Sequence, residues 1–355
     1  MFLDLNLYRR EVRVSSDPLI RLSAIDVAPD RPRRTFVFIH GLGGWAEQWQ
    51  YQLQYFLIEN RVVAIDMRGH GLSDRPRTGY DMPQIQRDLE NALEVLGVEG
   101  KFILAGHSFG GAVVTEYAHA HPDRVEGLVL IATAGQFKIA PVYAFGLLMP
   151  DWLQSIASGV LKKRLYAAPH ALKALYRDTV ATWVGWDMYR KLRVPTLVIR
   201  GHRDRVFDPA LFEEVARCIP GAEEADIPSS GHLVILERHE AVNRAMERFA
   251  AGEEQRSWRD APSHAPQTEP LTGKKLASRD SLRKERPWLR HYDAGVPYTT
   301  AVPHIPLHHL LRSAVRRFPR HPAIFFEGRR ISYRELNHQT NKFANALRSM
   351  NVGKG

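Results

Sequence analysis

Short apolar runs that alternate with segments of helical periodicity constrain the fold of this chain more than any other feature. Runs that are apolar on both faces are typical of parallel strands that helices cover on both sides. Strands that alternate with helices indicate an α/β fold with a mostly parallel, doubly wound sheet. The runs are Thr35–Ile39, Val62–Ile65, Phe102–Ala105, Leu128–Ile131, Thr196–Ile199 and, more weakly, Ala222–Ile227.

The segments around these runs add detail to the predicted sheet. Residues 11–27 alternate and turn at Ser16-Asp17-Pro18, which predicts two paired strands before the first run. A helix ending near Phe249-Ala250 closes this first unit, to which we assign residues 1–252. The helix predicted between the second and third runs has one apolar face, formed by Ile85, Leu89, Leu93 and Leu96.

Residues 136–191 interrupt the alternation and are rich in Trp, Tyr, Leu and Met. Their position before the next strand predicts an inserted helical lid over the carboxyl edge of the sheet. An apolar lid could line an acyl-sized pocket, so we assign Trp183 and Trp186 to substrate binding, although packing against the main domain explains them equally well. The other large apolar side chains of the predicted lid are Tyr143, Phe145, Leu147, Leu148, Met149 and Trp152.

The net charge of +10 belongs to the C-terminal part of the chain. Residues 1–255 contain 30 Lys and Arg against 32 Asp and Glu, whereas residues 256–355 contain 19 against 7. No recognisable nucleic-acid-binding fold with interleaved aromatic residues accompanies this charge, so we expect no nucleic-acid partner. The Lys162-Lys163-Arg164 cluster is compatible with peripheral membrane contact, but a solvated helix face is the simpler interpretation.

Cysteine content and hydropathy exclude several classes of protein. The lone cysteine, Cys218, excludes an internal disulfide and a cysteine-based metal site. The sequence shows neither a secretory signal at its N-terminus nor a stretch of about 18 apolar residues that could span a membrane. We therefore expect a cytoplasmic enzyme without metal or cofactor. The sequence does not indicate whether the protein is a monomer or an oligomer.

The strongest chemical motif is Gly106-His107-Ser108-Phe109-Gly110, which Gly111 extends. It lies directly after an apolar strand and before the helical pattern of Ala112–Ala120. A tight strand-to-helix turn requires small flanking residues and presents its central hydroxyl at the carboxyl edge of the sheet. This pattern predicts Ser108 as a nucleophile, and the alternative is a glycine-rich turn with an idle serine.

A serine hydroxyl needs an adjacent base, and the base needs an acid that fixes its tautomer. His232 lies in a loop after the last predicted strand, on the same edge as Ser108, which makes it the predicted base. Asp204 follows the strand Thr196–Ile199 on that edge and is the favoured acid. Asp208 is the competitor, although it could simply cap the helix that follows it.

The tetrahedral intermediate of acyl transfer requires backbone donors that face its oxyanion. One predicted donor is the N–H of Phe109, the residue after the nucleophile. We assign the other to Leu42, in the glycine-rich loop after the first predicted strand. The neighbouring residues that we assign to substrate binding are His40, Gly41 and His107.

These motifs resemble the α/β-hydrolase family over residues 1–250. The resemblance rests on His40-Gly41 with Gly43-Gly44, on the segment Asp66–Asp74, on the serine elbow, and on Asp204 with Gly231-His232. It implies an α/β-hydrolase fold and hydrolytic activity. In this family the Asp66–Asp74 segment, His70 included, is structural. Serine at the nucleophile position disfavours the epoxide hydrolase and haloalkane dehalogenase branches, which use aspartate there.

The C-terminal residues show a second resemblance. Residues 253–287 have the composition of a disordered linker. Pro287–Asp293, Gly295-Val296-Pro297 and Ile331–Asn337 with Gly353-Lys354-Gly355 resemble the opening of AMP-forming long-chain acyl-CoA ligases. The phosphate loop and the adenylation motifs of that family are not present. We interpret residues 288–355 as an N-terminal fragment of such a ligase and expect no ligase activity from it.

The same tail has the pattern of a small, incomplete α+β unit. Ala323–Glu327 predicts a strand, and Ser332 with Glu335 predicts a capping box that opens a helix through Leu347. An amphipathic helix precedes the strand, and its apolar stripe is Leu307, Leu310, Leu311, Ala314 and Phe318.

Together these features predict a serine hydrolase that cleaves a carboxylic ester or thioester with an apolar acyl group. Its substrate would be a small-molecule or lipid-like acyl ester. Fusion to a ligase would suggest that the released acid is then activated to acyl-CoA. Two alternatives stay open at this point: a carbon–carbon bond hydrolase or lyase that uses the same triad, and a non-catalytic binding module that keeps the fold.

Overall fold

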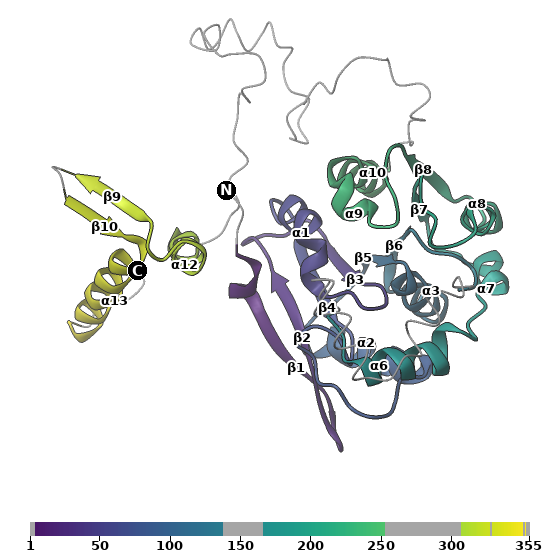
Figure 1. Cartoon of the computed structure of the whole chain (residues 1–355), viewed down its shortest axis with the longest axis horizontal. Coiled ribbons are helices and arrows are strands. Elements are labelled where there is room, and N and C mark those ends of the chain that lie inside the picture. The colour runs from purple at the N-terminus through teal and green to yellow at the C-terminus, as the bar shows by residue number, and fades with distance from the viewer. Residues whose placement is uncertain (1–3, 138–165, 253–306, 327–328, 351, 353–355) are drawn as a thin grey trace, which may run out of the picture.

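The computed structural model describes residues 4–137, 166–252, 307–326, 329–350 and 352 (Figure 1). Its centre is an eight-stranded sheet with the order β1-β2-β4-β3-β5-β6-β7-β8. β1 and β2 are antiparallel to their neighbours, and every other pair is parallel. The strands are β1 Arg9–Ser16, β2 Leu19–Val27, β3 Thr35–Ile39, β4 Arg61–Asp66, β5 Phe102–His107, β6 Val125–Ile131, β7 Thr196–Gly201 and β8 Glu223–Ile227.

Helices connect these strands and cover both faces of the sheet (Figure 1). The first short turn of 3-10 helix, η1, spans Leu5–Tyr8, and a second, η2, spans Ala46–Trp49. The α-helices of this unit are α1 Gln50–Phe56, α2 Met82–Val95, α3 Phe109–Ala120, α6 Pro169–Leu175, α7 Trp186–Lys191, α8 Pro209–Cys218, α9 Val234–Glu237 and α10 His239–Ala251, and the π-helical turn η3 spans Tyr176–Val180.

Alternate side chains of the parallel strands β3 to β7 enter two separate cores. In β3, Phe36 and Phe38 join the core that α1, α9 and α10 cover, and Val37 and Ile39 join the core under α2, α3 and α8. Burial on both faces is why these strands read as continuous apolar runs in the sequence. The sequence prediction of a doubly wound, mostly parallel sheet is therefore confirmed.

The predicted elements fall at the observed ones with small shifts at their ends. The first run, Thr35–Ile39, is β3 without change, the next four gain two or three residues each, and the last run, Ala222–Ile227, loses its first residue. The apolar face predicted on α2 is buried, and the carboxylate of Asp81 caps this helix by accepting a hydrogen bond from the N–H of Gln84. The helix predicted to end near Phe249 is α10.

Only part of the predicted lid lies within the described residues. α6, η3 and α7 occupy its second half, and the isolated bridge between His70 and Ala167 joins this half to the loop after β4. Residues 138–165 lie outside the described part. The predictions for Lys162-Lys163-Arg164 and for Tyr143, Phe145, Leu147, Leu148, Met149 and Trp152 fall there.

The described tail contains two helices and a two-stranded sheet. The helices are α12 Leu307–Arg317 and α13 Tyr333–Ser349, and the strands β9 Pro322–Phe326 and β10 Arg329–Ser332 are antiparallel. The capping box of Ser332 and Glu335 is present at the start of α13 as predicted. The predicted linker 253–287 and the motifs at Pro287–Pro297 and Gly353–Gly355 lie outside the described residues.

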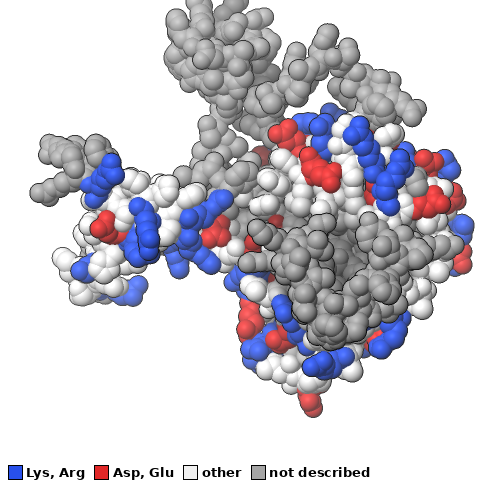
Figure 2. Space-filling model, in the orientation of Figure 1, with Lys and Arg blue, Asp and Glu red and all other residues white. Residues whose placement is uncertain are grey.

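The tail touches the sheet unit through α12. The N–H of Asp4 donates to Ser313 Oγ at 2.6 Å, and Arg316 lies 3.3 Å from the carboxylate of Asp4. Tyr8 Oη and His309 Nδ1 are 2.6 Å apart. Basic side chains dominate the visible face of the tail, whereas both signs mix over the sheet unit (Figure 2). Among the described helices, none is long and apolar enough to cross a membrane.

Candidate active site

Ser108 lies at the turn between β5 and α3 in a backbone conformation that few non-glycine residues adopt, with φ of 53°. Its N–H donates to Ile131 O at 2.8 Å, which fixes the turn against β6. A Cβ on Gly106 would overlap the backbone of Gly110, and one on Gly110 would overlap the carbonyl of Ile39. The glycines of the motif are therefore required because β3, β5 and α3 approach one another closely here.

His232 lies in the loop between β8 and α9 and faces Ser108. Its Nε2 is 2.9 Å from Ser108 Oγ. The loop is held upstream of the imidazole by two backbone contacts: Ser230 O accepts from the N–H of Arg203, and the N–H of Gly231 donates to Glu237 Oε2. The imidazole and the hydroxyl therefore lie within hydrogen-bonding distance without any movement of the loop.

Asp204 meets the other nitrogen of the same imidazole. Its Oδ2 is 2.8 Å from His232 Nδ1, and its Oδ1 accepts from the N–H of Val206 at 2.9 Å. The carboxylate is buried, where little water is available, and each of its oxygens has a hydrogen-bond partner in the protein. Asp208, the competitor from the sequence, instead caps α8 by accepting from the N–H of Ala210.

The carboxyl ends of three strands thus bring the three predicted residues together: β5 for Ser108, β7 for Asp204 and β8 for His232. Ser108 is 8% exposed and the side chain of His232 is 19% exposed, whereas the side chain of Asp204 is 1% exposed. The hydroxyl, the imidazole and the carboxylate form one hydrogen-bonded relay. Such a relay can take up the hydroxyl proton when the oxygen attacks an electrophile.

The two predicted oxyanion donors lie on the backbone segments that border Ser108. Phe109 is the first residue of α3, so its N–H belongs to the turn whose donors the helix itself does not use. Leu42 lies in a turn closed by the N–H of Gly44, which donates to Gly41 O at 3.0 Å. A Cβ on Gly41 would lie 2.9 Å from Ser108 Cβ. Gly41 therefore lets this turn pack directly against the candidate nucleophile.

His40 supports that turn and lies beneath it. Its Nδ1–H donates to Gly41 O at 2.8 Å, and its Nε2 accepts from the N–H of Met67 at 3.0 Å. The side chain is fully buried, and burial lowers its pKa to about 4. With both nitrogens committed to backbone groups, His40 orders the loop, and the structure does not bring it to a surface that a substrate would reach.

His70 fixes the same turn from the other side. Its Nε2 accepts from the N–H of Gly43 at 3.1 Å, and its Nδ1–H donates to Arg68 O. Burial, together with the nearby His40, lowers the pKa of His70 to about 3. The neutral ring can therefore stay an acceptor for the Gly43 N–H. This geometry agrees with the structural role that the family resemblance implies for this residue.

His107 also has both ring nitrogens engaged. Its Nε2–H donates to the carbonyl of His232 at 2.8 Å, and Gln48 Nε2 lies 3.3 Å from its Nδ1. The ring is buried, and burial lowers its pKa to about 3. The structure thus places His107 behind the base and not on a substrate-facing surface, which differs from the expectation for this residue.

Trp183 and Trp186 lie in the described half of the predicted lid. Trp183 is buried, packs against Phe137 with 5.5 Å between the ring centroids, and donates from Nε1 to Glu116 Oε1 at 2.9 Å. Trp186 is half-buried and covers Gly135, where a Cβ would overlap the indole ring. Both rings therefore pack against the main domain, as the alternative interpretation of the sequence holds.

Three residues near the relay were not identified from the sequence. Gln48 reaches His107 from η2, and Glu237 anchors the backbone of the base loop. Phe207 packs edge-on against the ring of His232, with centroids 5.7 Å apart, and also contacts Phe137. No local motif marks these positions, because each acts through a contact between segments that are distant in the chain.

The Asp66–Asp74 segment gives the site its foundation. The buried carboxylate of Asp66 accepts from the N–H of Ala46 and of Leu72, and it also pairs with Arg9 at 2.8 Å. A Cβ on Gly71 would overlap this carboxylate. Asp66 therefore joins the loop after β3, the loop after β4 and the start of β1 beneath the site.

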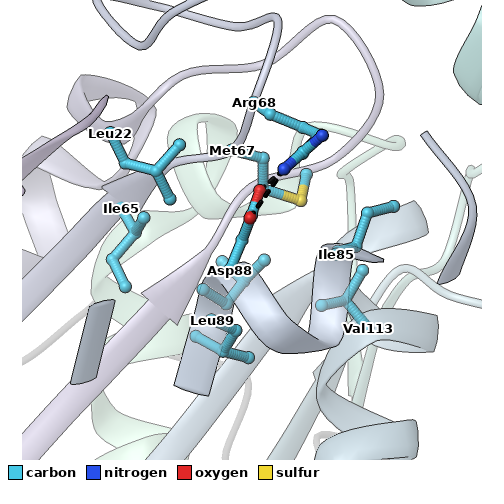
Figure 3. A pocket seen from close by; sticks show the side chains of 9 residues that line it. Leu22, Ile65, Met67, Arg68, Ile85, Asp88, Leu89 and Val113 are labelled. Carbon is cyan, nitrogen blue, oxygen red and sulfur yellow. Dashed lines mark hydrogen bonds and ion pairs between the residues drawn. The ribbon is translucent and has the colours of Figure 1, made fainter. Parts of the chain in front are cut away.

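A small cavity of about 10 Å³ lies between the sheet and α2 (Figure 3). This volume is at the lower limit for one water. Arg68 and Asp88 meet at its wall in a bidentate ion pair, with Arg68 Nη2 2.7 Å from Asp88 Oδ1. The cavity is a packing defect beside a structural ion pair and not a substrate site. Among the described residues, no cluster of His, Cys, Asp and Glu could hold a metal ion.

Comparison with known proteins agrees with this fold. Residues 34–184 match the family model described as alpha/beta hydrolase fold, and residues 311–355 match the model described as AMP-binding enzyme. The sheet unit therefore has the α/β-hydrolase fold. It is followed by a tail that resembles the AMP-binding enzymes.

Individual relatives extend over most of the hydrolase unit. The AB hydrolase superfamily protein YisY of Bacillus subtilis is 26% identical over 67% of this chain and 98% of its own length. The dihydrolipoyllysine-residue acetyltransferase component of the acetoin cleaving system of Pseudomonas putida is 33% identical over 60% of this chain. This chain spans only 62% of that second relative.

A solved structure of Est816, described as an N-acyl homoserine lactone degrading enzyme, is 26% identical to this chain. It superimposes with a TM-score of 0.58 and covers 68% of this chain and 100% of its own. This likeness supports the same fold for the sheet unit.

Proposed function

We propose that this α/β hydrolase cleaves carboxylic esters or thioesters through an acyl-enzyme on Ser108. The observation that carries the proposal is the relay in which His232 lies 2.9 Å from Ser108 Oγ and 2.8 Å from Asp204. A serine that merely fills a glycine-rich turn would not need a base and a buried carboxylate aligned behind it.

In the proposed reaction, His232 Nε2 takes the proton of Ser108 Oγ as the oxygen attacks the substrate carbonyl. The N–H groups of Phe109 and Leu42 stabilise the oxyanion of the tetrahedral intermediate. Asp204 stabilises the imidazolium, which then gives its proton to the leaving oxygen or sulfur. A water molecule, deprotonated by His232, cleaves the acyl-enzyme by the reverse sequence and regenerates the free hydroxyl.

The aromatic side chains beside the relay support an apolar acyl group as substrate. Phe207 packs on the His232 ring, and Phe137 lies between Phe207 and Phe109, with ring centroids 5.5 and 5.9 Å away. The lactone that Est816 degrades contains an ester bond, which is consistent with this class of substrate. Serine at the elbow continues to favour esters over epoxides.

The AMP-binding match of the tail supports a second element of the proposal. A hydrolase that releases a carboxylic acid produces the substrate that an acyl-CoA ligase activates. We propose that the hydrolase unit catalyses the first of these two reactions and acts on medium or long acyl chains. This element rests on the covalent linkage of the two units, and a preference for short acyl groups would count against it.

The proposal is tested with p-nitrophenyl esters from acetate to dodecanoate and with the matching acyl thioesters. We expect turnover of at least one ester, with octanoate preferred over acetate, and loss of that turnover by about a millionfold in Ser108→Ala. Ser16→Ala, which removes an exposed hydroxyl of β1, is the matched control and should keep wild-type rates. Wild-type protein without turnover of any ester would favour a carbon–carbon hydrolase, a lyase or a binding module.

A further inference from the structure

His107 links the backbone of the candidate nucleophile to the backbone of the candidate base. It is the last residue of β5 and directly precedes Ser108, so its backbone is rigidly tied to the nucleophile. Its Nε2–H donates to the carbonyl of His232 at 2.8 Å, and the two rings lie 5.0 Å apart. The peptide bond from His107 to Ser108 and the hydrogen bond from His107 to His232 thus join Ser108 and His232, which are 124 positions apart in the chain.

The second nitrogen of His107 fixes which tautomer makes that bond. Gln48 Nε2 lies 3.3 Å from His107 Nδ1, and only a lone pair on Nδ1 can accept from the amide. Gln48 is itself buried, and a Cβ on Gly44 would overlap its Oε1. The terminal amide of Gln48 therefore lies between Gly44, which its oxygen approaches, and the His107 ring, which its nitrogen approaches.

The base needs this support because it lies on a loop. Ser229, three residues earlier, has φ of 56°, and Leu233, the next residue, is 46% exposed. Other hydrogen bonds hold the backbone of Ser230 and Gly231 before the base and of Leu233 after it. The bond from His107 acts on the peptide carbonyl of His232 itself. Loss of that bond would remove the direct restraint on the His232 backbone and leave the imidazole held through Asp204 and Phe207.

We propose that His107 is a positioning residue for the hydrolase reaction: its Nε2–H holds the backbone of His232 at the distance from Ser108 that proton transfer requires, and Gln48 holds the tautomer. The inference rests on the proposed function of the relay. His107 does not contact the reacting atoms. Its lowered pKa agrees with this role, because a neutral ring places no positive charge beside the base.

Three substitutions of His107 separate positioning from packing. In His107→Gln, the amide nitrogen reaches the place of the imidazole Nε2 and can still donate to His232 O. In His107→Asn, the same amide is one methylene shorter and cannot reach that carbonyl. His107→Leu removes the donor and keeps apolar volume. The ester turnover number and KM are measured for each, with melting temperatures as the control for folding.

We expect kcat to fall by about 10- to 100-fold in His107→Asn and His107→Leu, because a displacement near 1 Å has an effect of this order. His107→Gln should stay within about threefold of wild type, and KM should change by less than about twofold in all three. Equal kcat in all variants, or a loss in the glutamine variant as large as in leucine, would overturn the positioning role.

Two measurements on wild-type protein separate this inference from the proposed function. Labelling by a fluorophosphonate tests the activated serine alone, and its absence would reject the hydrolase mechanism. The ¹⁵N shifts of the histidine signal that His107→Gln removes test the tautomer alone. We expect Nε2 to be protonated and Nδ1 unprotonated near neutral pH, and the opposite tautomer would overturn the link to His232 whether or not the serine is labelled.

Discussion

Asp204 and Asp208 lie four residues apart in one loop, yet their carboxylates serve different partners: Asp204 accepts from the imidazole of His232, and Asp208 accepts from the first turn of α8. The two residues share type, charge and sequence neighbourhood. The difference between them is geometric, since only the first is buried behind the base. The pair therefore offers a matched test of the relay.

Asp204→Asn should reduce kcat by a factor on the order of 10⁴, because the amide no longer stabilises the imidazolium or selects its tautomer. Asp208→Asn should leave kcat within about twofold, since asparagine caps a helix as well as aspartate. Both are measured by ester hydrolysis under saturating substrate. A large loss in Asp208→Asn with normal activity in Asp204→Asn would exchange the two roles.

Gly106→Ala should destabilise the protein, because the new Cβ would overlap the backbone of Gly110 at the elbow. Overpacking of this kind costs about 1–3 kcal/mol, and more where backbone must shift. Gly231→Ala is the matched control, since the nearest atoms to its Cβ, those of the Glu237 carboxylate, lie at 3.6 Å. Urea denaturation measures both variants, and similar stabilities would contradict the close approach of β5 and α3.

Acid should destabilise the fold between pH 6.5 and about 4, because burial lowers the pKa of His40 to about 4 and that of His70 and His107 to about 3. In this range the unfolded chain binds protons that the folded chain excludes, so the free energy of unfolding falls as the pH falls. Each histidine lowers the free energy of unfolding by about 1.4 kcal/mol for each pH unit of acidification, and the three together lower it by about 4 kcal/mol per pH unit.

The change in the free energy of unfolding with pH is measured by urea denaturation between about pH 6 and 4.5. His107→Gln should reduce it by about one histidine's share of roughly 1.4 kcal/mol per pH unit. His119→Gln, which removes an exposed histidine of α3, should leave it unchanged. The same slope in wild type and His107→Gln would show that His107 is not held neutral in the folded state.

Asp88→Asn should destabilise the fold by about 3–5 kcal/mol, because it leaves the buried guanidinium of Arg68 without its counter-ion. The exposed pair of Asp187 and Arg190 on α7 provides the comparison, and Asp187→Ala should change stability by less than about 1 kcal/mol. Thermal unfolding compares the two. An equal, small effect of both substitutions would mean that the Arg68 side chain reaches water.

The sequence predicted the sheet well because its strands are buried on both faces. β3, β4 and β5 are buried along almost their whole length, which makes the apolar signal continuous, and the helix after β4 has a clear apolar face. The elbow around Ser108 was predictable because backbone packing at Gly106 and Gly110 admits only glycine. These constraints act within a few residues, so one sequence suffices to see them.

Other features depend on contacts across the fold. His107 and Gln48 have no motif that links them to His232, and their hydrogen bonds exist only once β5, η2 and the β8 loop have assembled. The substrate-binding role expected for Trp183 also depends on which way its ring faces, and the ring packs into the core instead. Periodicity predicts burial and spacing, but not which buried polar group meets which partner.

The central claim is that Ser108 is an activated nucleophile. Intact mass measurement after treatment with an alkyl fluorophosphonate tests it without knowledge of the substrate. We predict one adduct per wild-type chain, located on the peptide that contains Ser108, no adduct in Ser108→Ala, and slow labelling in Asp204→Asn. An unlabelled wild-type protein, or an adduct that persists in Ser108→Ala, would contradict the claim.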